Sequence, residues 1–158
     1  FDITPIIWAF RKYHPKFVSK IELGKGIPSI SYNLRKGGAA LIDRKDPKQA
    51  ISTLANFAKN IKKNNWSAVI FPEGTRSRDG KPKKFASNGL KVISKYNKEG
   101  YVVPLTINNS WKVFKYGKFP LGIFSPIKIT THQPIKINSL PFDELLAQTE
   151  KVIKDHIK

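Results

Sequence analysis

The chain has 158 residues, enough for one domain with a real hydrophobic core and too few for two comfortable ones. It contains no Cys, which excludes disulfides, thiolate metal sites and a Cys nucleophile, and its three scattered His argue against a zinc site. The formal net charge of +18 favours a polyanionic partner, either nucleic acid or an anionic membrane, over a surface that is merely Lys-rich for solubility.

The chain contains no Met and begins with Phe1-Asp2, so we expect its natural N-terminus to lie upstream. No apolar run within it approaches the roughly 18–20 residues that span a bilayer. A membrane anchor in the upstream segment remains compatible with this sequence.

Helical and strand patterns alternate along the chain. A first helix is predicted over residues 3–13, with Asp2 at its capping position. The clearest helix starts at Asp46-Pro47, a cap followed by a proline in the first helical position. Its apolar residues, which recur at helical spacing and are expected to be buried, are Ile51, Leu54, Ala58 and Ile61.

Further helices are predicted over residues 28–36, around Leu90 and Ile93, and from Leu145 to Ile153. The predicted strands cover residues 16–20, 39–42, 67–71, 101–107 and 127–131. This order predicts an α/β fold, with a central, mostly parallel sheet flanked by helices, forming a single domain over residues 1–158.

Ligands of open α/β sheets gather at the loops that leave the carboxyl ends of strands. Two such loops carry charged residues here. Asp43-Arg44 follows the strand at 39–42, and residues 72–78 follow the strand at 67–71. If the two strands are neighbours, Arg44 lies near Arg76.

The second loop has the chemistry of a phosphate site. Arg76 offers a planar fork to phosphate oxygens, Thr75 and Ser77 add hydroxyl donors, and Gly74 leaves room for the backbone to approach. A polar surface turn, in which Glu73 pairs with an Arg, explains the same residues equally well.

Three segments resemble sequence blocks of the glycerolipid acyltransferase superfamily, the lysophosphatidic acid acyltransferases in particular, and a fourth resembles a strand between two of these blocks. FPEGTRS at 71–77 is identical to the third block of that family. GGAALIDR at 37–44 looks like the second block, VVPLTI at 102–107 resembles the fourth, and KFVSKIEL at 16–23 looks like the strand between the first and second. The resemblance covers the chain from Phe1 to about Ser110.

The family's first block is Asn-His, four residues and then Asp. Asp2 matches the final aspartate of this block, so the histidine is expected just upstream of Phe1. The resemblance implies that this histidine is the general base and that Asp2 orients it. The chain as printed is therefore expected to be inactive by itself.

The resemblance also implies the substrates. A fatty acyl group would pass from acyl-CoA or acyl-carrier protein to the free hydroxyl of a lysophosphatidic acid-like acceptor, in phospholipid biosynthesis, without a cofactor or metal. The expected location is the cytoplasmic face of the membrane, peripheral or anchored by the upstream segment. The implied acceptor-phosphate site consists of Arg76, Glu73, Gly74, Thr75 and Ser77, with Arg44 and Lys20 as secondary residues.

Several of these residues also have a simpler, purely structural interpretation. Asp2 can be only a helix cap, and Lys20 only a solvated strand end. His14, His132 and His156 are weak candidates for catalysis.

The segment WKVFKYGKF at 111–119 suits an amphipathic membrane contact or a strand with one face in the core. The alternative functions are a non-catalytic membrane-surface binder of lipid phosphate and a basic nucleic-acid-binding module.

Overall fold

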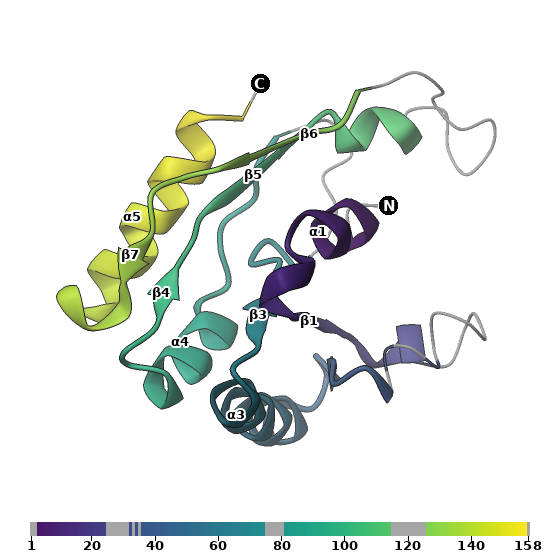
Figure 1. The fold of residues 1–158 in the computed structure, drawn as a ribbon, viewed down its shortest axis with the longest axis vertical. Coiled ribbons are helices and arrows are strands. Elements are labelled where there is room, and N and C mark those ends of the chain that lie inside the picture. Colours follow the sequence, from purple (N-terminus) through teal and green to yellow (C-terminus); the bar gives the residue numbers. More distant parts are fainter. Residues whose placement is uncertain are drawn as a thin grey trace. The chain divides into compact units, whose positions relative to one another are not determined.

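The computed structural model describes residues 3–24, 32, 34, 36–74, 81–114 and 126–157. The chain divides into two compact units. The sheet unit contains Ile3–Phe71 and Ser87–Lys98, and the C-terminal unit contains Phe1–Asp2, Pro72–Ala86 and Glu99–Lys158. Figure 1 shows the elements of both units.

The sheet unit is built on three parallel strands in the order β2-β1-β3. Strand β1 spans Pro15–Lys20, β2 spans Ala40–Ile42 and β3 spans Ser67–Val69. In register, Lys20 lies opposite Ile42 and Phe17 lies opposite Val69. Because the strands are parallel, their carboxyl ends lie at one edge of the sheet.

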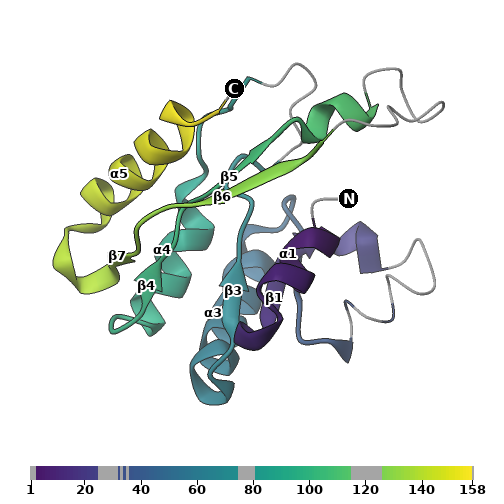
Figure 2. The same ribbon diagram turned by 45° about the horizontal axis from the view of Figure 1, so that its top comes forward.

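Two helices cover one face of this sheet, α3 (Pro47–Asn64) and α4 (Ser87–Tyr96), which lie side by side (Figures 1 and 2). Their apolar faces meet in a core of buried residues: Ala40, Leu54, Phe57, Ala58, Ile61 and Ile93. Strand residues two apart share a face, which is why alternate side chains such as Ala68 and Ile70 pack against this core. Helix α1 (Ile3–Ala9) lies on the side of β1 away from α3.

Helix α3 confirms the clearest helix predicted from the sequence. The side chain of Asp46 accepts a hydrogen bond from the Gln49 amide, Pro47 occupies the first turn, and Asn65 closes the helix in a left-handed conformation. One expectation for this helix is wrong, since Ile51 is 53% exposed. The core cluster reaches α3 only from Leu54 onward, so the first turn of the helix lies beyond it.

In the C-terminal unit, β4 (Tyr101–Val102) pairs with β7 (Ile135–Lys136), and β5 (Leu105–Asn108) pairs with β6 (Lys128–Thr131). Both pairs are antiparallel. Buried Pro104 separates β4 from β5 because proline has no N–H for a strand ladder, so the strand expected over residues 101–107 is two strands. Helix α5 (Phe142–Asp155) runs along β5 and β6 in Figures 1 and 2.

Short 3-10 turns complete the described elements, at Arg11–Tyr13, Ile21–Gly24, Ser110–Phe114 and Ile137–Ser139. The expected helix over residues 3–13 is thus α1 followed by one such turn. The predicted α/β fold with a parallel central sheet is confirmed, while the late strands pair antiparallel. The helix expected over residues 28–36 lies largely outside the described residues, and the single-domain expectation stays a prediction.

Candidate functional site

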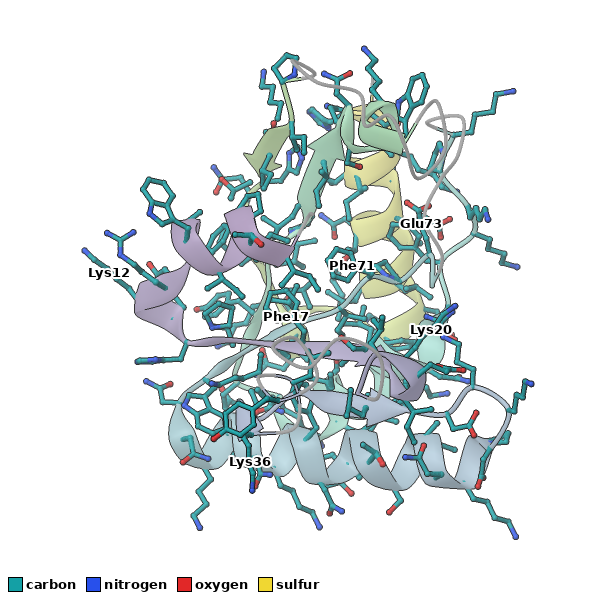
Figure 3. All side chains as sticks on the ribbon, turned by 90° about the vertical axis from the view of Figure 1, so that its right-hand side faces the viewer. Lys12, Phe17, Lys20, Lys36, Phe71 and Glu73 are labelled. Carbon is teal, nitrogen blue, oxygen red and sulfur yellow. The ribbon has the colours of Figure 1, made fainter. Side chains whose placement is uncertain are left out.

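Lys20 and Arg44 leave neighbouring strands at the same edge of the sheet. Lys20 is the last residue of β1 and stands opposite Ile42, the last residue of β2, and Arg44 follows two positions later. Both side chains are exposed, and Figure 3 shows Lys20 at the carboxyl end of its strand. The edge therefore presents two cations to solvent from adjacent strands, as an anion site requires.

A glutamine that the sequence analysis did not single out holds the turn that carries Arg44. The side-chain amide of Gln49 donates to the Leu41 carbonyl at 3.1 Å, and its oxygen accepts from the Asp43 amide at 2.9 Å. Asp43 in turn accepts from the Lys45 amide at 2.8 Å. Gln49 thus ties the first turn of α3 to the strand end and fixes the backbone on both sides of Ile42.

Replacing Gln49 by Ala should lower the free energy of unfolding by about 1–2 kcal/mol, because it removes two partly buried hydrogen bonds. Urea unfolding of the full-length protein measures the change. Gln148→Ala is a matched control, since Gln148 is exposed on α5 and its replacement should stay within about 0.5 kcal/mol. Equal stabilities of the two variants would contradict the role given to Gln49.

The strand leading to the second loop is β3, and its position corrects one expectation. Arg44 lies near Arg76 only if the strands at 39–42 and 67–71 are neighbours, and they are not, because β1 lies between β2 and β3. Phe71 stacks on Phe17 of β1, with ring centroids 6.5 Å apart, which holds the chain against the central strand just before the loop. Both rings are labelled in Figure 3. Lys20, rather than Arg44, therefore belongs to the strand next to β3.

The base of the second loop is closed by two hydrogen bonds. The Ala86 amide donates to the Pro72 carbonyl at 2.8 Å, and the Lys83 amide donates to Oε2 of Glu73 at 3.2 Å. Glu73 is therefore positioned to hold the two ends of residues 74–82 together. Gly74 has φ of +69°, a left-handed conformation that favours glycine over any residue with a side chain.

Asp2, Thr75, Arg76 and Ser77 lie outside the described residues, so their roles stay predictions. Most of the segment at 111–119 lies outside them too. In the described part of the chain, no group of three or more His, Cys, Asp or Glu could hold a metal ion. None of the described helices is both long enough and apolar enough to cross a membrane.

Comparisons with known proteins point to one family. An acyltransferase family profile matches residues 1–108. The chain is 29% identical to the chloroplast 1-acyl-sn-glycerol-3-phosphate acyltransferase BAT2 of Brassica napus over 134 residues, 85% of this chain and 37% of the relative. It is 36% identical to the 1-acyl-sn-glycerol-3-phosphate acyltransferase of Helicobacter pylori over 106 residues, 65% of this chain and 43% of the relative.

A solved structure agrees with these sequence matches. The crystal structure of PlsC, the 1-acyl-sn-glycerophosphate (LPA) acyltransferase of Thermotoga maritima, matches with a TM-score of 0.69 and 25% identity. The match covers 91% of this chain and 56% of that structure. The chain thus spans less than half the length of these two curated relatives and a little over half of the solved structure.

Proposed function

Because the chain belongs to the acyltransferase family, we propose that it is the catalytic part of a 1-acyl-sn-glycerol-3-phosphate acyltransferase. The observation that carries the proposal is the arrangement of the parallel sheet. Lys20 ends the central strand and Arg44 follows the strand beside it, both within the family match. An edge of this kind suits a phosphorylated acceptor.

The proposed reaction is acyl transfer without a covalent acyl-enzyme. A histidine upstream of Phe1 removes the proton from the free hydroxyl of a lysophosphatidic acid. The hydroxyl oxygen attacks the carbonyl of an acyl thioester, the carbon–sulfur bond breaks, and the thiol leaves with the proton. Asp2 accepts a hydrogen bond from the other ring nitrogen of that histidine and stabilises the imidazolium.

In the same proposal the loop after β3 binds the acceptor's phosphate. The planar guanidinium of Arg76 donates two hydrogen bonds to the phosphate, and the hydroxyls of Thr75 and Ser77 donate to the remaining phosphate oxygens. The hydrogen bond from the Lys83 amide to Glu73 supports a shaping role for this carboxylate, and the φ of Gly74 supports the tight turn. Lys20 and Arg44 would add positive charge at the strand ends.

The proposed setting is the cytoplasmic face of a membrane in phospholipid biosynthesis. A net charge of +18 favours contact with an anionic lipid surface, where a lysophospholipid acceptor also resides. The acyl donor is either acyl-CoA or acyl-carrier protein.

The test is an acyl-transfer assay with the full-length protein. Lysophosphatidic acid should be acylated and a monoacylglycerol, which lacks the phosphate, should be a poor acceptor; parallel reactions with acyl-CoA and acyl-carrier protein identify the donor. Residues 1–158 alone should show little turnover, and restoring the upstream segment should restore it. Equal turnover with and without that segment, or no preference for the phosphorylated acceptor, would count against the proposal.

A further inference from the structure

Helix α1 presents large apolar side chains to solvent. Ile6 is only 1% exposed and fixes the inner side of the helix, whereas Ile7 is 46% exposed and Trp8 is 72% exposed. Tyr13, in the turn that follows, is 63% exposed. Among the described residues nine large hydrophobic side chains are exposed, and these three fall within seven consecutive positions. Single exposed hydrophobic residues are ordinary, but a group of them marks a contact surface.

Two cations adjoin these apolar side chains. Spacings of three and four residues place Ile7, Trp8 and Arg11 on one side of the helix and of the turn that continues it. The guanidinium of Arg11 lies over the Trp8 ring, 5.5 Å from its centroid, and donates to the Trp8 carbonyl at 3.0 Å. Lys12 is exposed, and Figure 3 shows its side chain pointing away from the sheet. The surface therefore combines an isoleucine, an indole and two positive charges.

The positive charge of this segment is not balanced by nearby carboxylates in the sequence. Between Asp2 and Glu22 the chain has four Lys or Arg and no Asp or Glu. Within the described part of the chain, neither Arg11 nor Lys12 forms a salt bridge. Both charges are thus available to an anionic partner.

The mixture of side chains favours a lipid bilayer over other anionic partners. Tryptophan and tyrosine are enriched at membrane–water interfaces, where the ring contacts acyl chains and its polar end stays in water. Arginine and lysine bind lipid phosphates at the same depth. The outer face of α3 shows the contrast, because it carries exposed Lys59, Lys62 and Lys63 but no exposed aromatic residue. An electrostatic partner alone requires only a face of that second kind.

We propose that Ile7, Trp8, Arg11 and Lys12, called the α1 patch below, contact the headgroup region of an anionic bilayer. Trp8 and Ile7 reach the boundary of the acyl chains, and the two cations bind lipid phosphates beside them. Because α1 is already folded on the sheet unit, the contact requires no ordering of the backbone.

The α1 patch also suits the proposed acceptor, and in this respect the inference rests on the proposed function. Helix α1 follows Asp2 directly in the sequence, and Trp8 lies only about 8 Å along the helix axis from Ile3. A lysophospholipid could thus reach the residue that orients the base while its acyl chain stays in the bilayer. The test below uses no acyl transfer, so the membrane contact and the proposed reaction can fail separately.

The experiment measures how deeply a probe on α1 enters the membrane in the full-length protein. Thr4→Cys places a fluorophore on the side of α1 that carries Trp8; residues 1–158 have no other Cys, and any upstream Cys is replaced by Ser. With vesicles of phosphatidylcholine and phosphatidylglycerol, its emission should shift to the blue and be quenched by lipids that are spin-labelled near the headgroup. Ser52→Cys is the matched control: Ser52 is exposed on α3, and its probe should show neither change.

Charge variants test the electrostatic part of the contact at physiological salt. Each cation near an anionic surface strengthens binding about fivefold, so Arg11→Gln with Lys12→Gln should raise the lipid concentration needed for half-maximal quenching about twentyfold. Arg11→Lys with Lys12→Arg keeps both charges and should behave as the unmodified protein does. Lys59→Gln with Lys62→Gln removes the same charge from α3 and should leave the quenching unchanged.

Other occupants of the α1 patch give different results. A segment upstream of Phe1 that covered the patch would leave the probe on α1 unquenched by the spin-labelled lipid. A second copy of the chain would leave it unquenched as well, and would make its blue shift depend on the ratio of protein to lipid. Either result overturns the proposal, as does equal quenching of the probes on α1 and α3.

Discussion

Replacing Asp2 by Asn in the full-length enzyme should lower kcat for acyl transfer about a hundred- to ten-thousandfold, with a much smaller change in KM for the acceptor. A carboxylate fixes the tautomer of the proposed upstream histidine and stabilises the imidazolium that forms as the acceptor hydroxyl loses its proton. An amide of the same shape carries no charge and can hold the ring in the wrong tautomer. The measurement is steady-state kinetics with lysophosphatidic acid and the preferred donor.

The substitution is chosen so that helix stability does not confuse the result. Asp2 immediately precedes α1, which begins at Ile3, and Asn caps helices about as well as Asp. Asp46→Asn is the matched control, since Asp46 caps α3 through a hydrogen bond that its side chain accepts from the Gln49 amide. Asp46→Asn should keep normal turnover. If Asp2→Asn kept it as well, Asp2 would be a cap and nothing more.

Local signals in the sequence were enough to predict most elements. Asp46 and Pro47 predict the start of α3 because a cap and a first-turn proline satisfy or remove amides that lack partners in the helix. The segments predicted as strands at 16–20, 39–42 and 67–71 each overlap an observed strand. Propensity and periodicity act over a few residues, and these elements depend on little else.

The order of the strands in the sheet could not be predicted from such local signals. Strands that follow one another along the chain need not be neighbours in the sheet, and β1 lies between β2 and β3. The central position of β1 is a long-range property, since each of its sides pairs with a segment that follows later in the chain. It changes the candidate site, because Lys20 ends the strand that pairs with both β2 and β3.

The contacts that support the candidate site could not be predicted from the sequence either. Gln49 looks like an ordinary helix residue, and its two bonds to Leu41 and Asp43 depend on how α3 folds back on β2. The bond from the Lys83 amide to Glu73 spans ten positions of a polar loop with no periodic pattern. By contrast, the sequence analysis singled out Gly74 for the room it leaves beside a ligand, and the structure adds a left-handed conformation that favours glycine there.

Arg76→Ala in the full-length enzyme should lower kcat/KM for lysophosphatidic acid about ten- to a hundredfold. The proposed contact is a charge-assisted hydrogen bond pair to phosphate, worth about 1.5–3 kcal/mol. Arg76→Lys should recover only part of the loss, because a lysine ammonium is a point charge that cannot grip two phosphate oxygens in one plane. Steady-state kinetics at varied acceptor concentration gives both values.

The loss should fall on the phosphorylated acceptor and spare the donor, which separates a phosphate contact from general damage to the loop. With a monoacylglycerol as acceptor, the Arg76 variants and the unmodified enzyme should be equally slow, because no phosphate is present for the side chain to bind. Arg78→Ala supplies the control within the same loop: Arg78 lies one residue beyond FPEGTRS and carries the same charge, so simple electrostatic attraction would make the two losses equal. Specific binding by Arg76 instead predicts a much larger loss of kcat/KM in Arg76→Ala than in Arg78→Ala. Unchanged kinetics in both Arg76 variants would contradict a phosphate site in this loop.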